Sequence, residues 1–261
     1  RFELMLGEDG AVAPNRVQAS SQVRVAISPD GSRLVYVGVA PGGGFQLWER
    51  ALDDLEPRPI SGTATARGAA FSPDGRSVAF WAAGAIKTVS IGDGQPFTVA
   101  VEGGGSPTWG PDEMIYFPRG DIIRRAPVTG GESEAWTLPT TGGEHTLPAV
   151  LPDGRGLLLT VTRNSEQSRI GVVGPEGGEV REILPGTQAR YAAAGHIVYA
   201  VAGGTLMAVP FDLECLEVTG DEVALLEGEQ FEVGSAAQFA LSETGVLLYE
   251  ADAVARAEEL V

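Results

Sequence analysis

The side chains of this sequence best suited to binding chemistry are two arginines and one histidine: Arg67, Arg190 and His145. A guanidinium holds a carboxylate through two parallel hydrogen bonds, and an imidazole exchanges a proton near neutral pH. The other histidine is His196, and two histidines so far apart in sequence are a weak signal for zinc. We therefore treat Arg67, His145 and Arg190 as candidate contacts for a small anionic ligand, and we expect no metal and no cofactor.

The sequence lacks the signatures of covalent catalysis. A serine hydrolase needs a G-x-S-x-G turn between a strand and a helix, and the run GGGSP at 103–107 is not one. The single cysteine, Cys215, can form no disulfide within the chain, and we expect it to be a buried structural thiol. We expect no catalytic residue in these 261 residues.

Composition narrows the class of protein. The formal net charge is −17, so a nucleic-acid backbone would be repelled and we expect no nucleic-acid partner. No apolar run approaches the roughly 20 residues of a membrane-spanning helix, so this segment should not insert into a membrane. With 36 Gly, 17 Pro and 43% hydrophobic residues, the chain has the composition of a turn-rich all-β protein.

One tight turn recurs along the chain. In its full form, Ser-Pro-Asp-Gly, proline presets φ, aspartate bonds its own backbone, and glycine accepts a positive φ between two strands. The turns end at positions 31, 75, 113, 154, 195 and 245, a spacing of about 40 to 50 residues, which is typical of a β-propeller blade. The copies are SPDG (28–31), SPDG (72–75), GPDE (110–113), LPDG (151–154), AAAG (192–195) and SETG (242–245).

Two columns of residues align with these turns. Four places before each turn ends stands a large residue, and the place before it is held by a small residue in five of six repeats. Because strand residues alternate between faces, each blade would present a large side chain to one neighbouring blade. Its small residue would leave space for the large side chain of the other neighbour. The large column is Ile27, Phe71, Trp109, Val150, Tyr191 and Leu241, and the small one is Ala26, Ala70, Thr108, Ala149, Arg190 and Ala240.

These patterns predict an all-β fold: a six-bladed β-propeller of four-stranded antiparallel blades, forming a single domain over residues 1–261. The last repeat lacks an outer strand, and the N-terminal run Phe2–Leu6 has no blade of its own. We expect this run to join the last blade and close the ring, which would leave only short sheet edges. Both ends of the sequence lie in apolar runs, so we expect an excised fragment of a longer chain.

The predicted architecture places the three candidate residues. Arg190 interrupts the small column, so it either forms a salt bridge between blades or reaches an anion in the channel. Arg67 precedes the inner strand of the second repeat and could join it at the same end, and His145 should lie near an end of the channel. A surface or hydrogen-bonded histidine is the alternative for His145. The turn aspartates, Asp30, Asp74, Asp112 and Asp153, belong to different repeats, so we expect them to organise turns instead of sharing a calcium ion.

At this point the sequence resembles a known family. The runs SPDGSRLVYV and FSPDGRSVAF resemble the WD-like blades of TolB-type six-bladed propellers. Runs such as GGGSPTWGPDEMIYF and HTLPAVLPDGRGLLLT follow the order found in the propeller region C-terminal to bacterial Ser/Thr protein kinase domains. The resemblance implies a transmembrane kinase whose propeller is extracytoplasmic, periplasmic or at the cell surface. The turns GPDE and AAAG depart from the pattern, and no kinase motif lies in this segment.

We therefore expect a non-catalytic sensor or interaction domain that binds a peptide, a protein or a small anionic ligand. One alternative is a propeller enzyme, a lyase or glycan hydrolase with a polar site at the channel mouth; paired carboxylates there would favour it. A structural spacer with a channel filled by side chains is the other. Fold alone does not choose among them.

Overall fold

The computed structural model describes residues 2–4, 22–54, 56–92, 94–163, 168–201, 204–226, 237–251 and 254–259. These residues form β-strands joined by turns, with one short 3₁₀ turn, η2, at Pro152–Gly154. The described part of the chain contains no helix long and apolar enough to cross a membrane. The structure is therefore all-β.

Five blades are each built from one continuous stretch of chain, and their strands pair antiparallel in sequence order, except that the last strand of blade five pairs with its third strand. Blade one contains β2 (Val25–Ile27), β3 (Arg33–Val39), β4 (Phe45–Ala51) and β5 (Arg58–Pro59), and blade two contains β6 (Arg67–Phe71), β7 (Ser77–Ala82), β8 (Ala85–Ser90) and β9 (Phe97–Ala100). Blade three contains β10 (Thr108–Trp109), β11 (Met114–Arg119), β12 (Ile122–Pro127) and β13 (Glu134–Ala135). Blade four contains β14 (Glu144–Val150), β15 (Leu157–Thr162), β16 (Ser168–Val173) and β17 (Arg181–Pro185). Blade five contains β18 (Thr187–Ala192), β19 (His196–Val201), β20 (Thr205–Asp212), β21 (Glu217–Val218) and β22 (Val223–Leu226).

The predicted ring of six equivalent four-stranded blades needs correction. Blade five has five strands, because β21 and β22 pair with opposite ends of the long strand β20. The remaining sheet is a composite of both chain ends: β23 (Phe239–Leu241), β24 (Val246–Ala251) and β25 (Val254–Glu259), with β1 (Phe2–Leu4) paired antiparallel to β25. Five continuous blades and this composite sheet therefore replace six copies of one unit.

The structure also contains no closed sheet. Among the described residues, no strand ladder joins one sheet to the next, and the link between blades three and four is an isolated bridge between Thr137 and Gly178. The physical reason is that strand pairing ends at each outer strand, after which the chain crosses to a new inner strand. Neighbouring sheets then meet through side chains.

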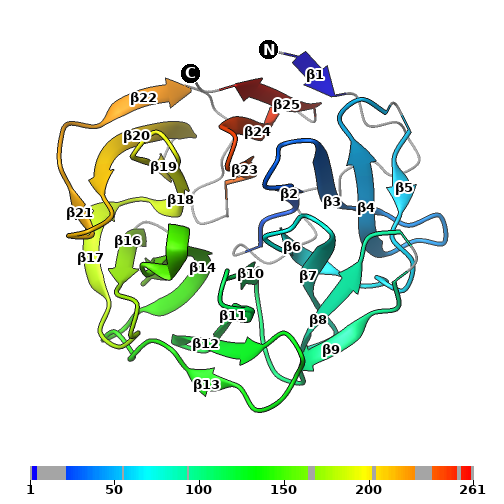
Figure 1. Ribbon diagram of the computed structural model, residues 1–261, viewed down its shortest axis with the longest axis horizontal. Helices are drawn as coiled ribbons and strands as arrows, with labels where there is room; N and C mark the ends of the chain where they lie inside the picture. The colour runs from blue at the N-terminus through cyan, green and yellow to red at the C-terminus, as the bar shows by residue number, and fades with distance from the viewer. Residues whose placement is uncertain are drawn as a thin grey trace.

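The inner strands surround a common centre (Figure 1). Strand β2 contacts β6 and β23, β10 contacts β6 and β14, and β18 contacts β14 and β23. Strands β1 and β25 pair at the outer edge of the composite sheet (Figure 1). This arrangement brings the recurring turns of all the repeats to one end of the centre.

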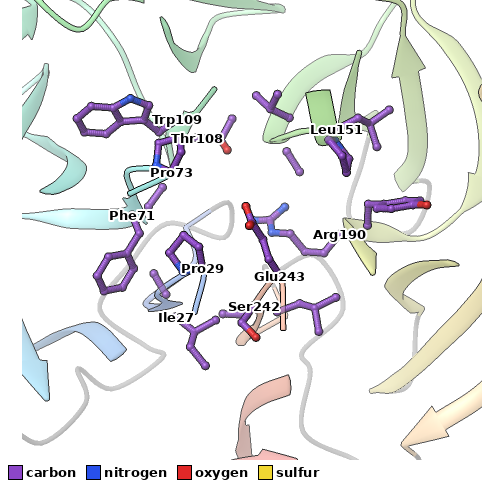
Figure 2. Close-up of a pocket in the computed structure, with 18 of the residues that line it drawn as sticks. Ile27, Pro29, Phe71, Pro73, Thr108, Trp109, Leu151, Arg190, Ser242 and Glu243 are labelled. Carbon is purple, nitrogen blue, oxygen red and sulfur yellow. The ribbon is translucent and has the colours of Figure 1, made fainter. Parts of the chain in front are cut away.

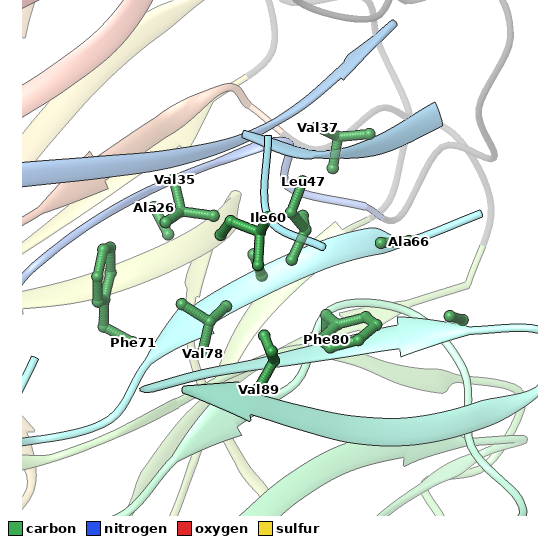
Figure 3. Packing of buried hydrophobic residues seen from close by; sticks show 12 residues of the cluster. Ala26, Val35, Val37, Leu47, Ile60, Ala66, Phe71, Val78, Phe80 and Val89 are labelled. Atoms are coloured by element: carbon green, nitrogen blue, oxygen red, sulfur yellow. The ribbon is translucent and has the colours of Figure 1, made fainter. Parts of the chain in front are cut away.

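Side-chain packing between neighbouring sheets follows the predicted large and small columns. Between blades one and two, Phe71 shares a buried cluster with Ala26, together with Val35 and Phe80 (Figure 3). The same pairing of a large residue with the preceding sheet's small residue joins Ile27 to the cluster of Ala240. Burial of these apolar surfaces is what holds one sheet against the next.

Three inner strands carry a bulge at the same level, three residues before the large column. Gly68, Leu147 and Gln188 have φ values of +57°, +51° and +52°, and the strand register shifts at each. Leu147 and Gln188 show that a side chain is accepted in this backbone conformation. Gly68 differs because a Cβ there would lie 2.6 Å from Ser106 Oγ and 2.8 Å from Ser106 Cα in blade three.

Replacing Gly68 with alanine should therefore destabilise the fold through a steric clash between blades two and three. We expect Gly68→Ala to lower the free energy of unfolding by about 1–3 kcal/mol, the range of overpacked buried sites. Chemical denaturation of the purified protein measures this change. Gly84→Ala is the matched control, because Gly84 has φ of +83° but nothing within 4 Å of its would-be Cβ. Equal losses in the two variants would contradict the clash.

Candidate functional site

The recurring turns are rigid, and their aspartates explain why. In blade one, Asp30 Oδ1 accepts hydrogen bonds from the Ser28 hydroxyl at 2.5 Å and from the Ser32 backbone N–H at 3.0 Å. These bonds stabilise the ionised carboxyl and lower the pKa of Asp30 to about 2, with the Ser28 hydroxyl as the main cause. Asp74 repeats this arrangement in blade two, with its pKa lowered chiefly by Ser72. Both aspartates organise turns.

At the turn end of the ring, these turns surround a pocket of about 590 Å³ (Figure 2). Its rim carries prolines from four of the turns, and large-column residues form much of its wall. Proline has no N–H and a fixed φ, so the rim is an apolar and stiff surface. The four prolines are Pro29, Pro73, Pro111 and Pro152.

Arg190 projects into this pocket from β18 (Figure 2). Its guanidinium donates a hydrogen bond to the carbonyl oxygen of the adjacent Ala189 at 2.9 Å, and no ion pair of the described residues includes Arg190. Burial lowers the pKa of Arg190 to about 10, and no neighbouring carboxylate offsets this effect. The pocket therefore holds a poorly solvated cation without a counterion among the described residues.

Two carboxylates line the same pocket. Asp153 comes from the turn of blade four and Glu243 from the turn of the composite sheet, so they stand on either side of blade five, which carries Arg190. Both are exposed at the rim. Glu243 is held in place through its backbone N–H, which donates to the carbonyl oxygen of Pro29 at 3.0 Å. The charged groups thus alternate in sign along one side of the rim.

Buried hydrogen bonds between inner strands lie immediately beneath the pocket. The Val23 backbone N–H donates to Ser106 Oγ at 2.8 Å, which joins the start of blade one to the start of blade three. Gln188 Nε2 donates to the carbonyl oxygen of Phe239 at 2.8 Å. Val23 and Phe239 both line the pocket, so we interpret these contacts as the floor of a bowl.

The structure separates the three residues that the sequence suggested as ligand contacts. Arg190 lies in the bowl, whereas Arg67 and His145 are not among the residues that line it. Arg67 begins β6 at the opposite end of that strand from Phe71, and its guanidinium lies over the ring of Trp81 at 5.9 Å from the centroid. Arg67 and Arg190 therefore do not form a pair at one mouth.

His145 is fully buried and has hydrogen bonds at both ring nitrogens. Its Nδ1 lies 2.8 Å from the hydroxyl of Thr137, and its Nε2 lies 2.8 Å from that of Thr140. Burial lowers the pKa of His145, which outweighs the smaller opposing influence of Asp121 and Glu182. His145 therefore acts as a neutral link between β14 and the preceding loop.

Cys215 and possible metal ligands are the remaining candidates for reactive groups. Cys215 is exposed, which corrects the expectation of a buried thiol; it follows the end of β20, in the turn toward β21. Asp212 Oδ1 accepts the Cys215 backbone N–H at 2.9 Å, so the turn holds this residue at the surface. Within the described residues, no group of three or more His, Cys, Asp or Glu side chains could hold a metal ion.

The burial of His145 predicts a pH-dependent stability. Folding lowers the pKa of His145 below its value of about 6.5 in the unfolded chain. The contribution of His145 to the free energy of unfolding is therefore fully present above about pH 6.5 and is lost as the pH falls below it. We expect His145→Gln to lower the free energy of unfolding by about 1–3 kcal/mol at pH 7.5, the range for a buried hydrogen-bonding group left unsatisfied. The difference between wild type and variant should shrink at pH 5, as measured by chemical denaturation.

The control for this experiment is His196→Gln. His196 shares a hydrogen bond of 3.0 Å between Nδ1 and the Ala194 carbonyl oxygen and is only partly buried. His196→Gln should lower the free energy of unfolding at pH 7.5 by less than His145→Gln does, because His196 is only partly buried. An unchanged gap between wild type and His145→Gln from pH 7.5 to 5 would contradict a buried neutral imidazole.

With this geometry established, comparisons with known proteins identify the fold. No family model and no curated protein matches the chain. Among solved structures, TolB from Acinetobacter baumannii matches with a TM-score of 0.63 and 18% identity, over 79% of this chain and 55% of TolB. The chain thus spans about half the length of that protein.

Two other solved structures match over most of the chain. The Cps50 (Swd1) β-propeller domain of Myceliophteria thermophila has a TM-score of 0.63 and 10% identity, over 94% of this chain and 99% of that one. Oligogalacturonate lyase from Vibrio parahaemolyticus has a TM-score of 0.55 and 13% identity, over 89% of this chain and 76% of that one. At these identities the likeness concerns the fold, which is a TolB-like β-propeller.

Proposed function

We propose that this propeller is a non-catalytic binding module and that its site is the bowl at the turn end. The ligand carries a carboxylate that contacts Arg190. The observation that carries this proposal is a partly buried guanidinium in a pocket of about 590 Å³ with no counterion among the described residues. A pocket of this size and largely apolar wall is typical of small-molecule sites.

Desolvation explains why an anion would bind at Arg190. Burial has already removed part of the water around the guanidinium, as the lowered pKa of about 10 indicates. A bound carboxylate would replace that water with charge-assisted hydrogen bonds, which are among the stronger polar contacts in proteins. The rigid rim means that little conformational entropy is lost when a ligand enters.

The net charge of −17 also bears on this proposal. The overall field of the chain repels anions at long range, an effect that salt screens beyond about 10 Å. Recognition of an anion must therefore depend on short-range contacts in the bowl. An anion held by Arg190 would be recognised by shape and hydrogen bonding rather than by general electrostatic attraction.

Replacing Arg190 should remove ligand binding without harming the fold. With 3-phenylpropionate as a simple carboxylate probe, we expect Arg190→Ala to weaken binding about 10- to 100-fold, as loss of a charged hydrogen-bonding partner does. Arg190→Lys should bind with intermediate affinity, because it keeps the charge but loses the planar fork. Ligand-observed NMR titration measures both.

Thermal unfolding distinguishes ligand contact from blade packing. Removing a buried cation without a counterion should leave the melting temperature within about 2 °C of wild type or raise it. The control is Arg58→Ala, which removes an exposed cation paired with Asp54 on blade one. A fall of several degrees for Arg190→Ala with binding retained would assign Arg190 to blade packing and overturn the proposal.

An enzyme remains a second candidate, and one observation favours it. Asp153 and Glu243 line the same bowl on either side of blade five, and paired carboxylates can act as acid and base on a sugar. One structure with this fold is an oligogalacturonate lyase. Release of unsaturated product from oligogalacturonate, abolished by Glu243→Gln, would favour this candidate over a binding module.

The broader biological role is part of the proposal. The sequence resemblance suggests that the propeller serves as the extracytoplasmic sensor of a bacterial Ser/Thr kinase whose catalytic domain lies outside these 261 residues. That attachment and location stay predictions. A ligand-binding bowl on a rigid propeller would suit such a role, because it offers a site whose occupancy a connected domain can detect.

A further inference from the structure

We infer that the bowl takes an amphiphilic zwitterion: a molecule with a carboxylate and a protonated amine near one end and an apolar body. This inference rests on the proposed function and adds the class of ligand. It starts from the uneven distribution of charge around the bowl. Its charged lining residues, Asp153, Arg190 and Glu243, come from blade four, blade five and the composite sheet.

The other half of the bowl is apolar. Blades one to three contribute prolines and large-column side chains, among them Pro29, Phe71 and Trp109 (Figure 2). Trp109 and Phe71 lie on one side of the pocket, whereas the Arg190 and Glu243 side chains extend into its centre from other parts of the ring (Figure 2). A ligand that fills the bowl therefore meets charged groups at one end and an apolar wall at the other.

The two carboxylates do not neutralise Arg190. No ion pair of the described residues joins Arg190 to Asp153 or Glu243, and burial is the cause of the Arg190 pKa shift. The cation is partly buried in the bowl, and both carboxylates are exposed at its rim. Each charge remains available to an opposite charge on a ligand.

This arrangement selects against ligands with one kind of charge. A dianion would gain from Arg190 but would be repelled by Asp153 and Glu243, and a simple cation would be repelled by Arg190. A molecule with one carboxylate and one amine can pair with Arg190 through the carboxylate and with a rim carboxylate through the amine. Free amino acids with large side chains and short peptides have this chemistry.

The rim position of Glu243 is well defined. Its backbone N–H bonds the Pro29 carbonyl oxygen, and the neighbouring Thr244 hydroxyl bonds the Asp30 carbonyl oxygen at 3.2 Å. Asp153 sits in a turn with φ of +56°. Turn geometry therefore holds the backbone of both residues at the rim.

Three probes with the same aromatic body test the inference. They are 3-phenylpropionate with a carboxylate, phenethylamine with an amine, and phenylalanine with both. We expect phenylalanine to bind wild type about three- to tenfold more tightly than 3-phenylpropionate, and phenethylamine most weakly, because each exposed ion pair contributes a factor of roughly two to five. Ligand-observed NMR titrations of the whole protein at 0.15 M salt measure all three.

Variants assign the effect to the rim carboxylates. Glu243→Gln and Asp153→Asn should each weaken phenylalanine binding about two- to fivefold, leave 3-phenylpropionate binding equal or tighter, and leave the melting temperature unchanged. Glu217→Gln is the matched control: its carboxylate is exposed on blade five near Arg181 and lies outside the bowl.

The results of these titrations distinguish the zwitterion inference from the proposed binding function. If 3-phenylpropionate binds wild type and not Arg190→Ala, but phenylalanine binds no better and the rim variants change nothing, the zwitterion inference is overturned and the proposed function stands. If none of the probes binds wild type, both are overturned. Preference for phenylalanine that persists in the double variant Asp153→Asn, Glu243→Gln would also overturn the inference.

Discussion

The structure depends on side-chain packing between sheets that share no strand ladder. Large-column residues fill the space left by small residues on the preceding sheet, as Phe71 does beside Ala26 and Ile27 does beside Ala240. Strand pairing ends at the outer strand of every blade, so apolar burial, together with a few hydrogen bonds such as that from Gln188 to the Phe239 carbonyl oxygen, sets how the inner strands approach one another. This packing places the turns at one end, and the turns form the bowl.

Much of this architecture was predictable from local patterns. The Ser-Pro-Asp-Gly turns and the alternation of Ile27 and Ala26 indicated propeller blades, because turn chemistry and strand periodicity act within a few residues. The pairing of the N-terminal run with the last sheet was also predicted, because the last repeat lacks an outer strand, whereas the expected ring of six equivalent blades was not found. The short strand β21 of blade five was not predicted; it forms because β20 is long enough to pair with two short strands at once.

The candidate site was predictable only in part, and strand position explains why. Arg190 precedes the large residue Tyr191 by one position, so the repeat placed it near the turn end. Arg67 precedes Phe71 by four positions, about 13 Å deeper along a strand, so it cannot share that mouth. Asp153 and Glu243 were treated as turn residues, although their place in the same turns as rim prolines was a signal that they line the mouth.

The hydrogen bond from Glu243 to Pro29 has a consequence for how the molecule assembles. It joins the last turn of the chain to the first, and both residues line the bowl. The binding site thus exists only when the beginning and the end of the chain have met. Any ligand that contacts both of these turns would favour, by mass action, the state in which the turns are in contact. Ligand binding in the bowl and the stability of the contact between the two turns are therefore thermodynamically linked.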